Sequence, residues 1–138
     1  MPYAGDVAPA AAYALLVADP AAVLVDVRTR AEWSYVGGPD LNGLGKPVLQ
    51  IEWVRFPDGA RNEGFVAQLE ATGVPKDAPV LFLCRSGVRS VAAAEAATAA
   101  GWTAAQNVLE GFEGNPDGAG HRGTTGGWKV AGLPWRQS

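Results

Sequence analysis

The chain has only one cysteine and one histidine among its 138 residues. A single cysteine excludes an internal disulfide and any zinc site built on cysteine pairs. The net charge is −3 and the basic residues form no run, which argues against nucleic acid or an anionic membrane surface as the main partner. No apolar stretch is long enough to span a membrane, and residues 1–22 lack the pattern of a signal peptide. We therefore expect a cytoplasmic protein with a free thiol.

The composition is that of a globular protein, with 48% hydrophobic and 18% charged residues. The length suits one domain over residues 1–138, and no repeat or linker divides it. Short apolar runs alternate with alanine-rich segments, a pattern that predicts a parallel α/β sheet with helices on both faces. We expect helices at residues 8–18, 29–35, 62–72 and 90–100, and strands at residues 22–27, 48–53, 80–83 and 106–109.

Cys84 directly follows the predicted strand at residues 80–83 and opens a loop that leads into the next helix. Ligands of open parallel sheets bind beyond the carboxyl ends of the strands, where this thiol is expected to lie. The free N–H groups and the dipole of a helix N-terminus favour an anion. Gly87 allows the loop to turn several N–H groups toward one point.

Two arginines, Arg85 and Arg89, flank the thiol, and no acidic residue lies between Asp77 and Glu95 to offset them. The positive charge and the helix N-terminus both favour a thiolate over a thiol. The sequence therefore predicts that Cys84 is a nucleophile rather than a buried structural cysteine.

Four stretches, spread over most of the chain, carry motifs in a fixed order. They are Cys84-Arg-Ser-Gly-Val-Arg-Ser90; Leu24-Val-Asp-Val-Arg28 followed by Glu32-Trp33; Asn107-Val-Leu-Glu-Gly111; and Gly127-Trp128 with Ala131-Gly-Leu-Pro134. Together they resemble the motifs of rhodanese-fold sulfurtransferases. The resemblance implies an α/β, rhodanese-like fold with a five-stranded parallel sheet and helices on both faces.

The same resemblance implies the chemistry. Cys84 would be the catalytic nucleophile and would carry sulfur as a persulfide. The sulfur would pass from a small anionic donor, such as thiosulfate or a persulfide, to a thiol or cyanide acceptor, with no metal or organic cofactor. The residues implied to bind the substrate are Arg85, Ser86, Gly87, Val88, Arg89 and Ser90.

Asp26 and Arg28 are expected to support this site from the end of a neighbouring strand. We interpret them as a buried ion pair or as a source of loop-bracing hydrogen bonds, in preference to direct substrate contact.

The chain departs from the family pattern in three respects. Ser86 stands where thiosulfate-using members commonly carry a second cation, so thiosulfate is a weaker candidate donor. The stretch at residues 36–39 has no histidine where many members have one. Residues 39–63 and 113–125 are longer than in compact members. We expect these two segments to flank the pocket mouth and to set the choice of acceptor.

Three other functions remain open. A cysteine phosphatase of the same fold needs five residues between cysteine and arginine, whereas four separate Cys84 from Arg89. A rhodanese-like interaction module usually lacks the cysteine. A sulfur-relay protein would keep the chemistry but use a protein thiol as donor or acceptor, and the sequence does not separate this case from transfer between small molecules.

One further motif is interpreted as structural. Residues 118–123 match the dinucleotide fingerprint, but no strand precedes them and no long helix follows, so we expect a glycine-rich loop. His121 lies in this loop and is expected to be exposed.

Overall fold

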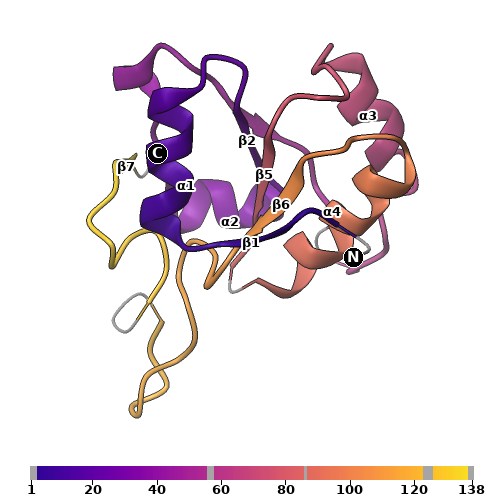
Figure 1. Cartoon of the computed structure of the whole chain (residues 1–138). Coiled ribbons are helices and arrows are strands. Elements are labelled where there is room, and N and C mark those ends of the chain that lie inside the picture. The colour runs from indigo at the N-terminus through magenta and orange to yellow at the C-terminus, as the bar shows by residue number, and fades with distance from the viewer. Residues whose placement is uncertain (1–2, 56–57, 86, 123–125, 137–138) are drawn as a thin grey trace.

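The computed structural model describes residues 3–55, 58–85, 87–122 and 126–136. Five strands form one sheet in the spatial order β1-β6-β5-β2-β4, and every neighbouring pair is parallel (Figure 1). This confirms the predicted five-stranded parallel sheet. The strands are β1 (Gly5–Val7), β2 (Val23–Asp26), β4 (Val48–Gln50), β5 (Val80–Leu83) and β6 (Ala105–Val108).

Helices cover both faces of the sheet, as predicted. α1 packs on one face, where Ala12 and Leu16 join a buried cluster with Leu81 and Leu83 of β5. α3 and α4 cover the other face (Figure 1). The helices are α1 (Pro9–Ala18), α2 (Arg30–Tyr35), α3 (Phe65–Ala71) and α4 (Val88–Ala99).

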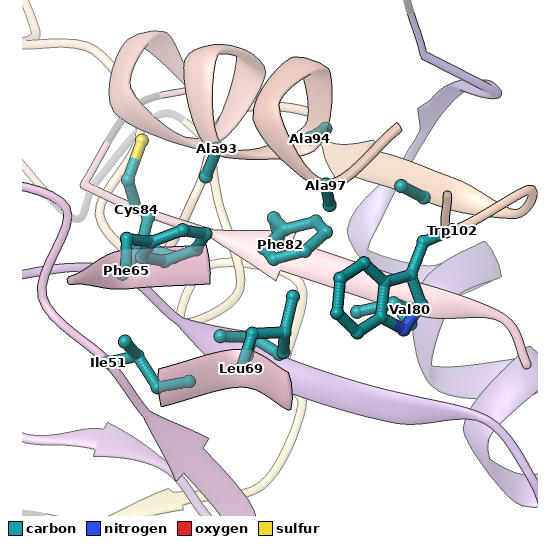
Figure 2. Packing of buried hydrophobic residues seen from close by; sticks show 13 residues of the cluster. Ile51, Phe65, Leu69, Val80, Phe82, Cys84, Ala93, Ala94, Ala97 and Trp102 are labelled. Carbon is teal, nitrogen blue, oxygen red and sulfur yellow. The ribbon is translucent and has the colours of Figure 1, made fainter. Parts of the chain in front are cut away.

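The central strand β5 is buried at all four positions, so its sequence is apolar throughout rather than alternating. Phe82 points toward α3 and α4, where Phe65 and the small side chains of Ala93 and Ala97 pack against it (Figure 2). The alanines allow α4 to approach the sheet closely. Cys84 lies at the end of this cluster, directly after β5 (Figure 2).

Two helix boundaries differ from prediction. α4 begins at Val88 instead of residue 90, because Gly87 adopts a left-handed conformation with φ of +113° and ends the loop early. Arg89 and Ser90 therefore lie in the first helical turn. α3 begins at Phe65 instead of residue 62, because the Asn62 side chain accepts a hydrogen bond from the Gly64 N–H and forms a local turn.

The strand predictions were incomplete at three places. β1 was not predicted from the residues, since Gly5-Asp-Val7 is too short to show a pattern. β4 ends at Gln50, three residues before the predicted end. The segment at residues 37–47, where no helix or strand was predicted, contains β3 (Gly38–Pro39), which pairs with β7 (Trp135–Arg136), and a short 3-10 helix at Asn42–Leu44.

Within the described ranges, no helix is both long and apolar enough to cross a membrane. The same part of the chain holds no group of three or more histidine, cysteine or acidic side chains arranged to bind a metal ion.

Candidate active site

The Cys84 sulfur lies where β5 ends and the N-terminus of α4 begins. The Gly87 N–H donates to Sγ at 3.0 Å, and Ser90 Oγ lies 3.2 Å from the same sulfur. Cys84 is almost fully buried, and it lines a pocket of about 280 Å³ with Arg85, Val88 and Arg89. A backbone donor and a hydroxyl therefore meet at one sulfur atom, in a residue whose pocket is also lined by two arginines.

Ser90 links the sulfur to a chain of polar side chains. Its hydroxyl donates to Asn107 Oδ1 at 2.5 Å, and the Asn107 amide donates to Asp6 Oδ1 at 3.0 Å. The Tyr3 hydroxyl also donates to this carboxylate, at 2.8 Å. Because a hydroxyl has one proton, Ser90 accepts from the Cys84 thiol while it donates to Asn107. To donate to a Cys84 thiolate, the Ser90 hydroxyl would have to turn this proton from Asn107 toward the sulfur.

The segment after β6 forms backbone hydrogen bonds with the beginning of the Cys84 loop. The Phe112 N–H donates to the Cys84 carbonyl at 2.8 Å, and the Glu113 and Gly114 N–H groups donate to the Arg85 carbonyl at 3.0 and 3.1 Å. Gly111 makes this approach possible, because a Cβ there would lie 2.6 Å from the carbonyl carbon of Arg85.

Asp26 and Arg28 form the buried ion pair expected from the sequence. Arg28 Nη2 donates to Asp26 Oδ2 at 2.7 Å, and both side chains have no exposed surface. Arg28 Nη2 also donates to the Gly37 carbonyl at 2.6 Å, and its guanidinium lies 4.5 Å from the centre of the Phe112 ring. The backbone N–H of the same Phe112 donates to the Cys84 carbonyl, so the ion pair and the Cys84 loop both contact this residue.

Arg89 is paired with Glu32, which corrects the expectation that no carboxylate offsets the loop arginines. Nη1 and Nη2 of Arg89 donate to the two carboxylate oxygens of Glu32 at 2.7 and 3.0 Å. Glu32 also accepts from the Thr29 N–H in the capping box that begins α2. Glu32 comes from a motif 57 residues away, which the local count of charges near Cys84 did not include.

The ion pair has a defined effect on both pKa values. Burial alone would raise the pKa of Glu32, but the hydrogen bonds from Arg89 and Thr29 and the charge of Arg89 outweigh it, so the pKa lies below its ordinary value. Burial would lower the pKa of Arg89, but the hydrogen bond and charge of Glu32 outweigh it and raise the pKa. Both groups are therefore held in their charged forms.

A second, shallower pocket of about 470 Å³ adjoins the first, and the two share Arg85 and Arg89 as lining residues. Both extended segments contribute to it, Val54 from residues 39–63 and Glu113 and Arg122 from residues 113–125. Their position at the mouth is as expected. Arg122 was not predicted as a site residue, since nothing in its local sequence relates it to Cys84.

The other predicted site residues differ in their relation to the sulfur. Val88 is 79% exposed beside Cys84, and Gly87 directs its N–H at the sulfur. Ser86 lies outside the described residues. His121 is exposed, as expected, and lies outside the helices and strands of the described residues. Another pocket, of about 760 Å³, lies elsewhere, between α2, the β3–β7 sheet and β4, and Cys84 does not line it.

Comparisons of this chain with known proteins agree on one family. Residues 4–138 match the family model described as STR4 middle domain. Rv0390 of M. tuberculosis is 54% identical, and its crystal structure matches with a TM-score of 0.92 over 99% of both chains. Protein THYLAKOID RHODANESE-LIKE, chloroplastic, of Oryza sativa subsp. indica is 33% identical over 135 residues, which are 97% of this chain and 25% of that protein.

A more distant solved structure shares the fold. It is the polysulfide-sulfur transferase homodimer from Wolinella succinogenes, which is 21% identical with a TM-score of 0.63 and covers 96% of this chain and 78% of that chain. The chain therefore belongs to the family of the STR4 middle domain, which is a rhodanese-like family.

Proposed function

We propose that the protein moves sulfane sulfur from a small anionic donor to a thiol or cyanide acceptor through a persulfide on Cys84. The observation that carries the proposal is the convergence of the Gly87 N–H and the Ser90 hydroxyl on one buried sulfur. The Gly87 N–H donates to Sγ and stabilises negative charge on the Cys84 thiolate, and the Ser90 hydroxyl does the same once its proton turns from Asn107 toward the sulfur. The polysulfide-sulfur transferase of the same fold supports this reaction class.

In the first half-reaction the Cys84 thiolate attacks the outer sulfur of the donor. A new S–S bond forms to Cys84, and the bond from that sulfur to the rest of the donor breaks. The leaving group departs with the electron pair, as sulfite from thiosulfate or as a shortened polysulfide. Arg85, which is exposed beside Cys84, supplies positive charge for the anionic donor.

In the second half-reaction an acceptor thiolate or cyanide attacks the outer sulfur of the persulfide. The bond between the two sulfurs of the persulfide breaks, and Cys84 leaves as a thiolate. The enzyme returns to its starting state, so ping-pong kinetics are expected. A thiol on another protein would fill the acceptor role in a sulfur relay.

The pairing of Arg89 argues against the phosphatase alternative. Phosphoryl transfer on a cysteine loop needs a guanidinium that closes on the phosphoryl oxygens. Both Nη atoms of Arg89 already donate to Glu32. The loop is also one residue shorter than that chemistry needs.

The test is intact-mass analysis after exposure to thiosulfate or inorganic polysulfide. We expect the mass gain of one sulfur atom on the wild type and none on Cys84→Ser, with the gain reversed by cyanide. Absence of the adduct with every donor, together with hydrolysis of an aryl phosphate that requires Cys84, would replace the proposal by the phosphatase.

A further inference from the structure

We propose that Arg122, together with Arg85, binds the carboxylate of a low-molecular-weight thiol acceptor at the pocket mouth and thereby sets acceptor preference. The inference rests on the proposed sulfur transfer and names the acceptor class for the same site.

Five charged side chains line the 470 Å³ pocket beside the thiol. Arg89 and Glu32 neutralise each other through two hydrogen bonds. Within the described part of the chain, no ion pair joins Arg85 or Arg122 to a carboxylate. The pocket is therefore lined by two arginines that lie outside these ion pairs and by one further acidic residue, Glu113.

Arg122 is held in place by the backbone of its own segment. Its Nη1 donates to the Gly114 carbonyl at 2.7 Å, and the side chain is half-buried. Gly114 in turn donates its N–H to the Arg85 carbonyl at 3.1 Å. The position of the Arg122 guanidinium is thus coupled to the start of the Cys84 loop, although the two are far apart in sequence.

The arrangement fits a thiol that carries a carboxylate. Guanidinium groups bind carboxylates through paired N–H donors, and two of them favour an anion over a neutral acceptor. The acceptor sulfur has to reach the 280 Å³ pocket that Cys84 lines, and that pocket shares Arg85 with the outer one. Glu113 adds a place for an ammonium group, so an amino-acid thiol matches all three charges.

The transfer step itself is unchanged by this inference. The acceptor thiolate forms a bond to the outer sulfur of the persulfide, and Cys84 leaves as a thiolate. Arg122 touches the part of the acceptor that does not react, so it lowers the free energy of binding by charge complementarity.

The experiment loads the full chain with inorganic polysulfide, removes excess donor and measures the rate of sulfur release to four thiols. These are 3-mercaptopropionate, cysteine, 2-mercaptoethanol and cysteamine. For each thiol the variant is compared with the wild type, so that the intrinsic reactivity of the thiol cancels.

We expect Arg122→Gln to slow release to 3-mercaptopropionate and cysteine by roughly two- to fivefold relative to 2-mercaptoethanol, the size expected for one partly exposed charge contact. Arg122→Lys should retain most of the preference, and Arg122→Glu should favour cysteamine. Arg136→Gln is the matched control, since Arg136 lines the separate 760 Å³ pocket. It should leave all four rates unchanged.

Three outcomes overturn the inference. An equal slowing of all four thiols by Arg122→Gln means that Arg122 only holds the backbone at Gly114. Slower loading of Arg122→Gln by polysulfide, with unchanged release to all four thiols, assigns Arg122 to the donor. If Arg122→Gln releases sulfur to the four thiols in the same ratio of rates as the wild type, the acceptor does not contact Arg122. Failure of the wild type to load sulfur at all would instead contradict the proposed function.

Discussion

Both Nη atoms of Arg89 donate to the carboxylate of Glu32, at 2.7 and 3.0 Å, and so join the first turn of α4 to α2 across 57 residues of sequence. The pair is about four-fifths buried. The pair fixes the helix that presents Ser90 and Gly87 to the sulfur. It also pairs the positive charge of Arg89 with Glu32, whereas the local sequence assigns that charge to substrate binding.

The pair predicts a pH-dependent contribution to stability. The pKa of Glu32 in the folded protein is lowered, so the stabilisation is fully present above its ordinary value of 4.5 and is lost as the pH falls through the folded-state pKa. Glu32→Gln keeps an acceptor for Thr29 but removes the charge. We expect it to reduce the free energy of unfolding by about 1–2 kcal/mol at pH 7.

The measurement is urea unfolding of wild type and Glu32→Gln between pH 7 and acid. The difference between the two proteins should be constant down to about pH 5 and shrink below 4.5. A difference that persists at low pH would show that the carboxylate charge is not its source.

Ser90→Ala tests the hydroxyl beside the sulfur. Removing it deprives the thiolate and the persulfide of one donor, and we expect loading of Cys84 to slow by roughly three- to tenfold, in line with one hydrogen bond. It also leaves Asn107 Oδ1 buried without its partner, at a cost of about 1–3 kcal/mol in stability. Rapid-mixing kinetics and thermal unfolding measure the two effects separately.

Thr98→Ala is the matched control for Ser90→Ala, because Thr98 lies on the same helix and its hydroxyl donates to the Ala94 carbonyl, away from the sulfur. It should leave the loading rate unchanged. Equal loading rates in wild type and Ser90→Ala would mean that the hydroxyl serves only the fold.

Gly111→Ala tests the close approach behind the Cys84 loop. The new Cβ would lie 2.6 Å from the carbonyl carbon of Arg85, at a residue with φ of +61°. We expect a loss of at least about 3 kcal/mol in stability and of persulfide formation with it. Gly118→Ala, with no atom within 4 Å of the new Cβ, should be neutral in the same thermal-unfolding assay. A stable, active Gly111→Ala protein would contradict this account of the loop.

Asp26→Ala tests the buried ion pair. The change leaves the Arg28 guanidinium buried without its counter-charge, and we expect it to cost about 3–5 kcal/mol. Glu70→Ala removes the partner of Lys76 in an ion pair at 3.8 Å whose side chains are 46% and 55% exposed, and it should cost about 0–1 kcal/mol. Denaturant unfolding compares the two. Similar losses would mean that Asp26 contributes no more than a surface charge.

Sequence reasoning found the parts of the molecule that are encoded locally. The apolar run of β5, the alanine-rich α4 and the loop that opens at Cys84 each carry their signal within a few residues. Asp26 and Arg28 were recognised because both lie at the end of one strand.

The residues that sequence reasoning missed act through contacts between distant segments. Glu32 meets Arg89, Asn107 meets Ser90, and Arg122 reaches the mouth from a segment with no periodic pattern. β1 has only three residues and gains its strand conformation by pairing with β6. Such partners are set by the packing of the sheet and not by local propensity.

The hydrogen bond from Asn107 to Asp6 spans 101 residues. On the ribosome, Asp6 emerges long before Asn107 and has to wait for β6 before it can meet its partner. Until then Ser90 lacks the amide that orients its hydroxyl. The full set of hydrogen bonds behind the hydroxyl beside the thiol is therefore complete only when both β1 and β6 have joined the sheet.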